Sequence, residues 1–328
     1  MRVLLTGASG FVGSHVTKRL AMLGHETLAV DARPPNYPLP RGVSFIRADI
    51  TDPQSLLHIV GEFDAVINLA SLFSYSASKD LLLRVNVLGA ENLMKRIGSL
   101  RAQRIIHFSS ASIYGFVPRN EQPIPETREP EPSNDYELSK SLQEKVVRKY
   151  CSELGLGLVV FRPAAIYGRG SRYGVFKVIK MYSEGKLRFI PGTGKVTPAL
   201  VSIDDVVGFL VHVLRNESCT SGKTFNVSDD SLRTLEGLML LLSEEAGVPP
   251  PRMKVPAPIV RLVAKAEEVR AKISGSEPEF TSSEAEYLLH DYVLDNSAMK
   301  STGYRLLVPD SADGIVQVLK QVSVQVLN

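Results

Sequence analysis

The stretch "TGASGFVG" at residues 6–13 decides the fold, because it joins a strand-like run to the start of a helix. The run before it, "RVLLT", is short and apolar, as expected of a buried strand. After the turn, apolar residues recur at helical spacing from Val12 to Leu23, and Gly24 is a natural C-terminal stop. Glycines between a strand and a helix allow a tight turn and leave the first N–H groups of the helix open to an anion.

The rest of the first half repeats this alternation of short apolar runs and helical patterns. Further strands are predicted at residues 26–31, 43–49, 65–71, 104–110 and 156–163. Helices are predicted between them at about residues 53–60, 80–98 and 135–154. Strands and helices in this order predict an α/β protein with a doubly wound parallel sheet of the Rossmann type.

The second half is less regular and predicts a smaller, mostly helical substrate domain. Helices are expected at residues 173–185, 203–215, 232–247 and 256–273, with a late strand at 223–228. We assign residues 1–165 and 198–228 to a nucleotide-binding domain, and residues 166–197 and 229–328 to a substrate-binding domain. The Pro-rich acidic segment 118–132 is read as a loop, either a solvated connection or a lid over a site.

The composition excludes several classes of protein. The 328 residues are 44% hydrophobic with a net charge of +3, and no apolar run approaches the ~20 residues that span a bilayer. The first predicted strand begins at residue 2, so we expect no signal peptide and a cytoplasmic protein. The two cysteines are far apart, the six histidines are scattered, and Lys and Arg form no run. Metal and nucleic acid are therefore not expected as ligands.

The glycine turn and the second strand together predict a dinucleotide site. The spacing Gly7-x-x-Gly10-x-x-Gly13 is looser than the strict pattern, but it still lets the backbone approach a pyrophosphate closely. Asp31 ends the second strand, near the ~20-residue spacing of an acid that binds a ribose hydroxyl. Such an acid repels a 2′-phosphate and favours NAD over NADP, although Arg33 is close enough to weaken that preference.

The segment "NDYELSKSLQEK" at residues 134–145 places Tyr136 one helical turn before Lys140. A free tyrosine has a pKa of ~10 and needs a pKa ~3 units lower to act as a base near neutrality, which a neighbouring cation favours. Ser109 and Ser110 end the fifth predicted strand, at the edge of the sheet where sites gather. The alternative is an amphipathic surface helix that carries both side chains without a catalytic role.

At this point the chain resembles a known family. The segments "TGASGFVG", "NLAS", "VNVLGAENLM", "SSASIYG", "YELSK", "FRPAAIYG" and "VSIDDVV" occur in the order typical of extended short-chain dehydrogenases/reductases, the NAD-dependent epimerase/dehydratase family. The resemblance covers nearly the whole chain. The combination of motifs is specific, although each motif is modest by itself.

The resemblance implies a role for each matching residue. Tyr136 would be the catalytic acid/base, and Lys140 would lower its pKa and hold the nicotinamide ribose. Ser110 would orient the substrate, and Asn86 would support the site, unless it is simply a buried hydrogen-bonding residue. The implied cofactor contacts, beside Asp31, Arg33, Tyr136 and Lys140, are Gly7, Gly10, Phe11, Val12 and Gly13 at the phosphates, Asp49 and Ile50 beside the adenine, and Leu69, Ala70, Ser71 and Pro163 along the cofactor.

Three departures from the family pattern concern the substrate. Nucleotide-sugar enzymes usually carry Asn where Ala165 stands, and often an Arg near Thr197 and Pro198, both of which contact the diphosphate. Their absence removes charge-assisted hydrogen bonds and puts a UDP-sugar substrate in doubt. Ala111 and Ser112 replace the acidic pair of the sugar dehydratases, which argues against dehydration.

The leading hypothesis is an NAD-dependent oxidoreductase that transfers hydride between nicotinamide and a secondary alcohol or ketone, as 3β-hydroxysteroid dehydrogenases and ketone reductases do. Segment 255–273 is apolar enough to line a pocket for such a substrate, or else to pack in the core. The alternatives are a nucleotide-sugar 4-epimerase with tightly bound NAD and a dinucleotide-binding module without catalysis. Family habit suggests a homodimer through the helices at 80–98 and 135–154.

Overall fold

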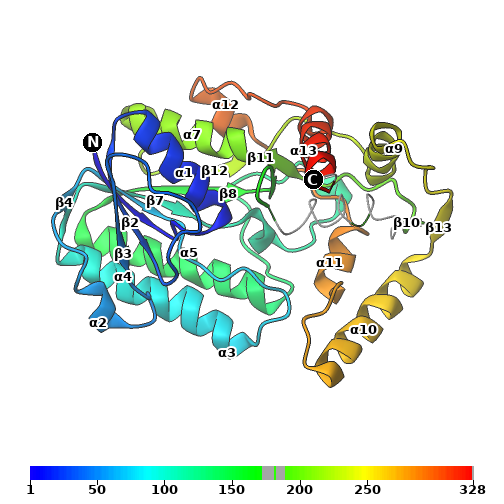
Figure 1. Cartoon of the computed structure of the whole chain (residues 1–328), viewed down its shortest axis with the longest axis horizontal. Coiled ribbons are helices and arrows are strands. Elements are labelled where there is room, and N and C mark those ends of the chain that lie inside the picture. The colour runs from blue at the N-terminus through cyan, green and yellow to red at the C-terminus, as the bar shows by residue number, and fades with distance from the viewer. Residues whose placement is uncertain (172–180, 182–188, 327–328) are drawn as a thin grey trace.

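The computed structural model describes residues 1–171, 181 and 189–326, and it contains a seven-stranded parallel sheet (Figure 1). All seven strands predicted from the sequence are confirmed. The sheet is made of β1 (Arg2–Thr6), β2 (Glu26–Asp31), β3 (Val43–Arg47), β5 (Ala65–Asn68), β7 (Arg104–Phe108), β8 (Gly157–Pro163) and β12 (Thr224–Val227).

The strand order β12-β8-β7-β5-β1-β2-β3 makes the sheet doubly wound. From β1 the chain first adds β2 and β3 on one side, and then returns to add β5 and the later strands on the other. Thr6, at the end of β1, pairs with Val30 of β2 and Asn68 of β5. The reversal of direction opens a crevice at the carboxyl ends of β1 and β5, where ligands bind in such sheets. The predicted Rossmann-type fold is thus confirmed.

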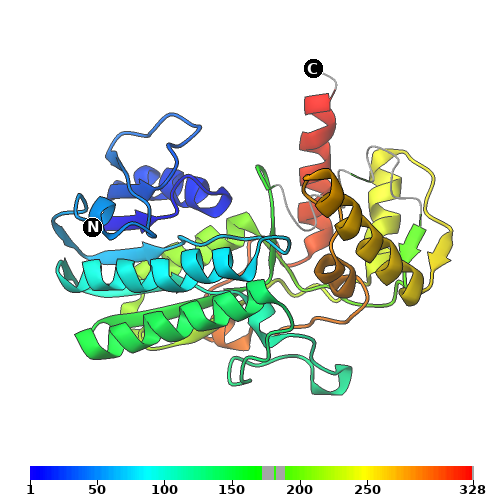
Figure 2. The ribbon, with the colours of Figure 1, turned by 90° about the horizontal axis from the view of Figure 1, so that it is seen from below.

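Helices cover both faces of the sheet (Figures 1 and 2). One face carries α1 (Phe11–Met22) and α7 (Ile203–Arg215), and the other carries α4 (Gly89–Gly98) and α5 (Asp135–Leu154). The core accordingly divides into one apolar cluster on each side of the strands. Short elements complete this part: α2 (Pro53–Leu56), α8 (Glu217–Thr220), α12 (Ser297–Ser301), the paired strands β4 (Glu62–Phe63) and β6 (Arg101–Ala102), the pair β9 (Ala165–Tyr167) and β11 (Leu200–Ser202), and the 3-10 helices Ala111–Tyr114 and Arg119–Glu121.

Two predicted helices differ from the structure. The helix expected at 53–60 ends at Leu56, and the Ile59 carbonyl beyond it accepts hydrogen bonds from Arg96 of α4. The helix expected at 80–98 consists of α3 (Lys79–Leu82), a π-helix at Leu83–Leu88 and α4. A π-turn adds one residue to a helical turn and is frequent at functional sites. The hydrophobic periodicity of the sequence does not show where such a turn occurs.

The second part of the molecule is smaller and mostly helical, as predicted, and lies on the right of Figure 1. It contains α9 (Leu235–Ala246), α10 (Ala257–Ser274), α11 (Ser282–Tyr287), α13 (Ser311–Val326) and the paired strands β10 (Phe189–Pro191) and β13 (Met253–Val255). The helix expected at 173–185 lies almost wholly outside the described residues. No helix among the residues described here has the length and apolar character needed to cross a membrane.

The loop at residues 118–132 is packed against the rest of the chain. Ile124 is buried and its N–H donates to the Val293 carbonyl at 2.8 Å. Glu126 accepts a hydrogen bond from the Asn226 N–H of β12 at 2.8 Å. The expected solvated connection thus describes only its exposed residues, such as Arg119 and Glu129, and the lid stays a prediction. The loop's contacts with residues 291–295 hold the two parts of the molecule together.

Candidate active site

The glycine turn forms a cradle whose shape depends on the missing side chains. Gly7 has φ +73°, and a Cβ there would lie 2.7 Å from the Leu69 carbonyl carbon. A Cβ on Gly13 would collide with the Gly7 carbonyl oxygen. Gly10 is the N-cap of α1, so the N–H groups of Phe11, Val12 and Gly13 belong to the first helical turn, which has no internal acceptors for them. These residues fit a pyrophosphate at the helix N-terminus.

Asp31 lies beside this cradle at the end of β2. Its carboxylate accepts hydrogen bonds from the Ser9 N–H and the Arg33 N–H, both at 3.0 Å. The Ser9 hydroxyl in turn donates to the Arg33 carbonyl at 2.7 Å. Asp31 is therefore held by two loops at the edge of the crevice, where it fits a ribose hydroxyl pair, and the Arg33 side chain is exposed next to it.

The other predicted cofactor residues line the same edge of the sheet. Leu69 and Ala70 follow β5 and pack behind Gly7, and Ser71 after them is exposed. Ile50 is buried against Gly89 of α4, whereas Asp49 is exposed and accepts the Thr51 N–H at 2.8 Å. Pro163 is buried at the end of β8. All these positions fit the path of a dinucleotide across the strand ends.

Tyr136 and Lys140 lie on the buried face of α5, one turn apart. The helix begins where Asn134 caps it, with the Asn134 side-chain oxygen accepting the Glu137 N–H at 3.0 Å. Burial raises the pKa of Tyr136, while a hydrogen bond with Ser110 acts in the opposite direction. Burial lowers the pKa of Lys140 to about 7. A protonated phenol and a cation that can lose its charge thus share one face of the helix.

The Lys140 ammonium is held by the strand ends. It donates to the Phe108 carbonyl at 2.8 Å and to the Gln143 side-chain oxygen at 2.5 Å. The Gln143 amide donates to the Ala70 carbonyl at 3.0 Å, which links α5 to the loop after β5. Gln143 was missed from the sequence, although its place two turns after Tyr136 puts it on the same helical face and was a usable signal.

Ser110 ends the segment that follows β7. It caps the 3-10 helix Ala111–Tyr114, accepting the Ser112 N–H at 3.2 Å, and its hydroxyl lies 2.8 Å from the Ser112 hydroxyl. The hydrogen bond between Ser110 and Tyr136 brings the predicted hydroxyl and phenol together. A substrate oxygen that reaches both groups could exchange a proton with the phenol while the serine holds it.

Asn86 projects inward from the π-helix and acts on the backbone around the site. Its side chain forms two hydrogen bonds with the Leu72 peptide, accepting the N–H at 2.7 Å and donating to the carbonyl at 3.0 Å. It also donates to the Ser139 hydroxyl at 2.8 Å, which donates to the Tyr136 carbonyl at 2.7 Å. Asn86 therefore joins the loop after β5 to the first turn of α5, and we describe it as a positioning residue.

An aromatic wall, defined by Phe73, Tyr75, Phe116 and Tyr287, closes one side of Tyr136. The Phe73 and Tyr75 rings lie 4.9 and 5.4 Å from the Tyr136 ring, both edge to face. Tyr287 of α11 lies 5.9 Å from Tyr75 and 5.2 Å from Phe116. Sequence reasoning missed this wall, because its rings come from two loops and a helix that meet only in the folded chain.

Glu137 fixes α11 against α5 beside this wall. Its fully buried carboxylate accepts hydrogen bonds from the Tyr287 hydroxyl at 2.6 Å, the Ser133 N–H at 2.7 Å and the Asn134 amide at 2.7 Å. Burial raises the pKa of Glu137, and these three donors act to lower it. The aromatic wall beside Tyr136 is thus built partly by the second, helical part of the molecule.

The positions that depart from the family pattern offer no positive charge. Ala165 is exposed on β9, opposite Leu200 of β11. Thr197 and Pro198 line a cavity of about 220 Å³ together with Tyr292 and the loop that follows β12.

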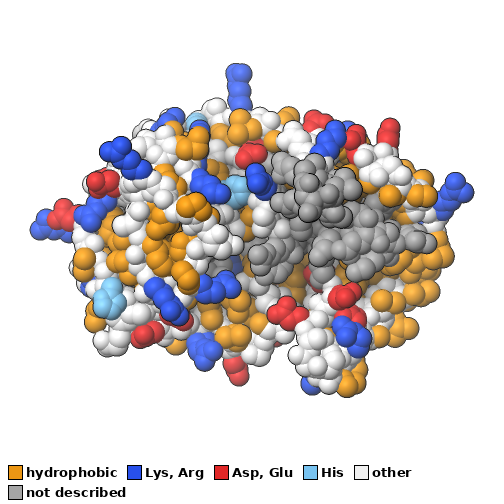
Figure 3. Space-filling view, in the orientation of Figure 1, with side chains coloured by type: hydrophobic (Ala, Val, Ile, Leu, Met, Phe, Trp, Pro, Cys, Tyr) orange, Lys and Arg blue, Asp and Glu red, His pale blue; other side chains and the backbone are white. Residues whose placement is uncertain are grey.

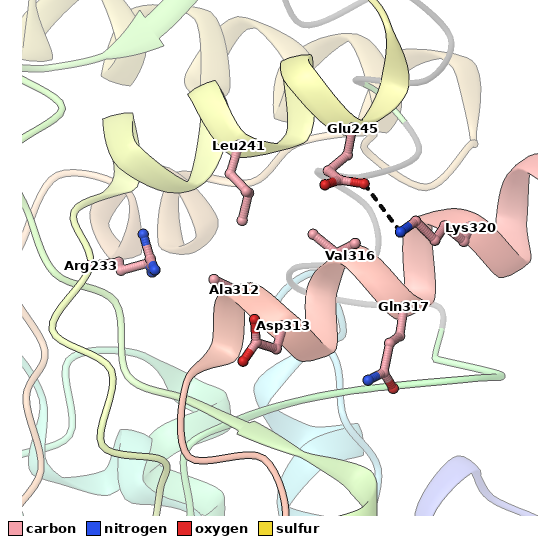
Figure 4. Close-up of a pocket in the computed structure, with 8 residues that line it drawn as sticks. All are labelled: Arg233, Leu241, Glu245, Ala312, Asp313, Val316, Gln317 and Lys320. Atoms are coloured by element: carbon pink, nitrogen blue, oxygen red, sulfur yellow. Dashed lines mark ion pairs between the residues drawn. The ribbon is translucent and has the colours of Figure 1, made fainter.

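A separate groove of about 480 Å³ lies between α9 and α13 (Figure 4). Leu241 of α9 and Val316 of α13 point into it from opposite sides, and Glu245 pairs with Lys320 across it at 3.4 Å. It contains none of the residues described above, so it is distinct from the candidate active site.

Comparison with known proteins supports this architecture. The chain is 25% identical over 307 residues to N-acetyl-alpha-D-glucosaminyl-diphospho-ditrans,octacis-undecaprenol 4-epimerase of Escherichia coli O157:H7, covering 92% of this chain and 89% of that protein. It is 28% identical over 273 residues to sterol demethylase protein B of Methylococcus capsulatus, covering 80% of each. The crystal structure of UDP-glucose 4-epimerase from Thermotoga maritima with UDP-glucose superposes with a TM-score of 0.80 at 22% identity, covering 99% of this chain and 100% of that one.

The sequence model of one family matches residues 3–228, which include β1 to β12, the glycine turn, Ser110, Tyr136 and Lys140. This match covers more than half of the chain and agrees with the doubly wound sheet. The chain therefore belongs to the NAD dependent epimerase/dehydratase family, a family of NAD-dependent enzymes.

Proposed function

We propose that this protein is an oxidoreductase that transfers hydride between NAD and a secondary alcohol or ketone on an apolar, ring-shaped substrate. The observation that carries the proposal is the aromatic wall, whose Phe73 and Tyr75 rings lie against Tyr136. Aromatic faces and edges bind flat apolar rings well and offer little to a diphosphate. Ala165 and Pro198, which carry no charge, agree with this preference.

The proposed chemistry uses the proton of Tyr136. When bound, NAD supplies the acceptor or donor of hydride at the strand ends. Ser110 holds the substrate oxygen, and Tyr136, whose pKa burial keeps above its usual value, donates its proton to a ketone oxygen during reduction. In the oxidative direction the phenol must first be deprotonated, so the rate of alcohol oxidation should increase with pH.

The cofactor residues favour NAD over NADP. Asp31 is held in place by two backbone N–H groups, and its carboxylate would repel a 2′-phosphate. Lys140 would hold the nicotinamide ribose, and Gly7, Gly10 and Gly13 would hold the pyrophosphate.

We further infer a cytoplasmic enzyme, because the described cysteine Cys151 is a free, buried thiol that fits a reducing compartment.

The relatives support two reactions. Similarity to sterol demethylase protein B favours an apolar alcohol or ketone substrate, whereas similarity to the undecaprenol-linked epimerase favours transient oxidation of a sugar followed by reduction. The aromatic wall favours the first reaction.

The domain division at residues 165, 198 and 228 remains a proposal, in which the second domain supplies Tyr287 to the substrate side.

A substrate panel tests the proposal. The purified protein is incubated with NAD and cyclic secondary alcohols, including sterols, or with UDP-glucose and UDP-N-acetylglucosamine. We expect reduced nicotinamide to accumulate with the apolar alcohols and no change in the nucleotide sugars. Conversion of a nucleotide sugar to its 4-epimer without net reduction of NAD would overturn the proposal in favour of the epimerase. Binding of NAD without turnover of any compound would favour a non-catalytic module.

A further inference from the structure

The outer face of α10 is apolar along its whole length. Ile259, Leu262, Val269 and Ile273 are between 49 and 83% exposed, and exposed Ala266 lies between them. Their spacing of three and four residues places all five on one side of the helix. An ordinary surface helix exposes polar residues on this side, so the face is unusual for a protein surface.

The opposite face of α10 already packs on the protein. Val260, Ala264 and Ala271 are buried there, and Val260 and Ala264 pack with Ala285 of α11. Arg261 forms two hydrogen bonds with Glu286 of α11, at 2.7 and 2.9 Å. The exposed stripe is therefore a second apolar face, additional to the one that folding uses.

The charges of α10 are arranged asymmetrically about this stripe. Lys265 and Lys272 are exposed along one flank and form no ion pair within residues 1–171, 181 and 189–326. The acidic side chains bond to the protein instead: Glu268 accepts from the Ser282 N–H at 2.7 Å, and Glu267 pairs with Arg270 at 2.6 Å. An apolar stripe flanked by lysines with free charge is complementary to a negatively charged surface.

We propose that α10 docks on an anionic lipid surface, with the stripe Ile259, Leu262, Ala266, Val269 and Ile273 facing the acyl chains. A helix of this kind lies in the plane of the interface, and long lysine side chains extend from its flank to the lipid headgroups. The helix lies at the edge of the molecule (Figures 1 and 2), and hydrophobic side chains gather on that edge in Figure 3. It can therefore approach a flat surface without a change in the fold.

A second copy of the chain fits this face less well. Antiparallel pairing of two α10 helices through the stripe would bring Lys265 and Lys272 of one copy beside those of the other, where like charges repel. An anionic lipid surface removes this repulsion, since each lysine near such a surface contributes about 1 kcal/mol to binding. The arrangement of charges therefore selects lipid over self-association.

The docked helix would also lie close to the proposed substrate side. α10 packs on α11, and α11 carries Tyr287 of the aromatic wall. An enzyme docked in this way could take up an apolar substrate from the membrane. The docking itself does not depend on the proposed reaction, because lipid binding is measured without turnover.

Vesicle flotation of the full chain tests the proposal. The vesicles are phosphatidylcholine alone, or phosphatidylcholine in which about a third of the lipid is phosphatidylglycerol. We expect binding to the anionic vesicles, weakened by high salt. Each lysine is expected to contribute about five-fold to vesicle affinity. Changing both Lys265 and Lys272 to Glu should therefore weaken vesicle binding at least about 25-fold. The pair Leu262→Gln and Ile273→Gln should weaken it about ten-fold or more.

The matched control is Met22→Gln, which changes a well-exposed apolar residue at the end of α1. This variant should bind vesicles like the wild type. Absence of binding to either kind of vesicle would overturn the proposal. Equal vesicle binding by the wild type and both α10 variants would also overturn it. An association between copies of the chain that the α10 variants abolish would overturn it in favour of a second copy as the occupant.

Discussion

Lys140 is a buried cation whose folded-state pKa of about 7 makes stability depend on pH. In the unfolded chain Lys140 keeps its proton up to its ordinary pKa of about 10.5, so between these values the unfolded state binds more protons. The free energy of unfolding should therefore rise as the pH increases from 7 towards 10. In Lys140→Met this rise should be smaller, as measured by urea unfolding of both proteins at several pH values. If the free energy of unfolding rises equally with pH in the two proteins, Lys140 keeps its proton in the folded state.

Asp31 is expected to decide between the two dinucleotides. In Asp31→Ala the carboxylate that would repel a 2′-phosphate is gone, and the exposed Arg33 remains beside the site. We expect the ratio of NADP to NAD affinity to rise by about ten-fold or more, equivalent to about 1.4 kcal/mol. Titration of both cofactors into wild type and variant measures it. The control Asp49→Ala should leave the ratio unchanged, because Asp49 is assigned to the adenine, which NAD and NADP share.

Gly13→Ala tests the cradle around the pyrophosphate. Its new Cβ would collide with the Gly7 carbonyl oxygen and lie 2.8 Å from the Ala8 Cα and carbonyl oxygen. The backbone of the turn must therefore move. We expect a loss of about 1–3 kcal/mol in stability and a large loss of NAD affinity. Gly24→Ala is the control: its φ of +75° also disfavours alanine, but nothing lies within 4 Å, and NAD affinity should stay normal. Normal affinity in Gly13→Ala would contradict the assigned role of the turn.

Single residues differ in how far the sequence reveals them. Tyr136 and Lys140 could be predicted together because helical spacing places them on one face, and Asp31 because it ends a strand. The Phe108 carbonyl that accepts from Lys140 could not, since it reaches Lys140 only through the packing of α5 on β7. Gln143, three residues after Lys140 on the same helix, could have been found from helical spacing. The rings of the aromatic wall come from residues 73 to 287, and no local pattern connects them.

At the scale of elements, α11 is expected to shape the substrate side through one hydrogen bond. Tyr287→Phe removes the donor to the buried Glu137 carboxylate at 2.6 Å and keeps the ring. We expect a loss of about 1–3 kcal/mol in stability, because a buried carboxylate loses one of its donors. KM for the apolar substrate should rise more than kcat falls, because α11 is no longer held against α5. Unchanged stability and kinetics would show that this contact contributes nothing.

The strands were the most predictable elements and the short helices the least. A run such as "RVLLT" is buried on both faces and reads clearly as a strand in a parallel sheet. The π-helix Leu83–Leu88 reads as an ordinary helix, because one added residue does not break the apolar pattern enough to be seen. In α10, the sequence predicted the helix correctly, but the structure was needed to show that one apolar face stays exposed.

At the scale of the whole molecule, we expect a homodimer through the face that α4 and α5 share. Leu88 is half-exposed at the start of α4, and Tyr150 of α5 donates to Glu91 of α4 beside it at 3.2 Å. Leu88→Asp should convert the dimer to a monomer in sedimentation velocity, whereas Met22→Asp on the opposite face of the sheet should not. A wild-type protein that sediments as a monomer at all concentrations would contradict this prediction.

The arrangement of the two parts could be predicted only in outline. The order of strand and helix patterns predicts the doubly wound sheet, and the less regular second half predicts the helical part. How the two parts meet depends on long-range contacts, such as Asn226 of β12 donating to the carbonyls of Ile124 at 2.9 Å and Asp295 at 3.1 Å. Such contacts have no signature in local sequence.

The most direct test of the account is the steady-state rate of nicotinamide reduction with an apolar secondary alcohol in wild type, Tyr136→Phe and Tyr75→Phe. Tyr136→Phe should lower kcat at least ~100-fold while the protein still binds NAD, because proton transfer is lost. Tyr75→Phe, which keeps its ring in the wall, should retain most of the activity. Full turnover by Tyr136→Phe would contradict the central claim that this phenol exchanges the substrate proton.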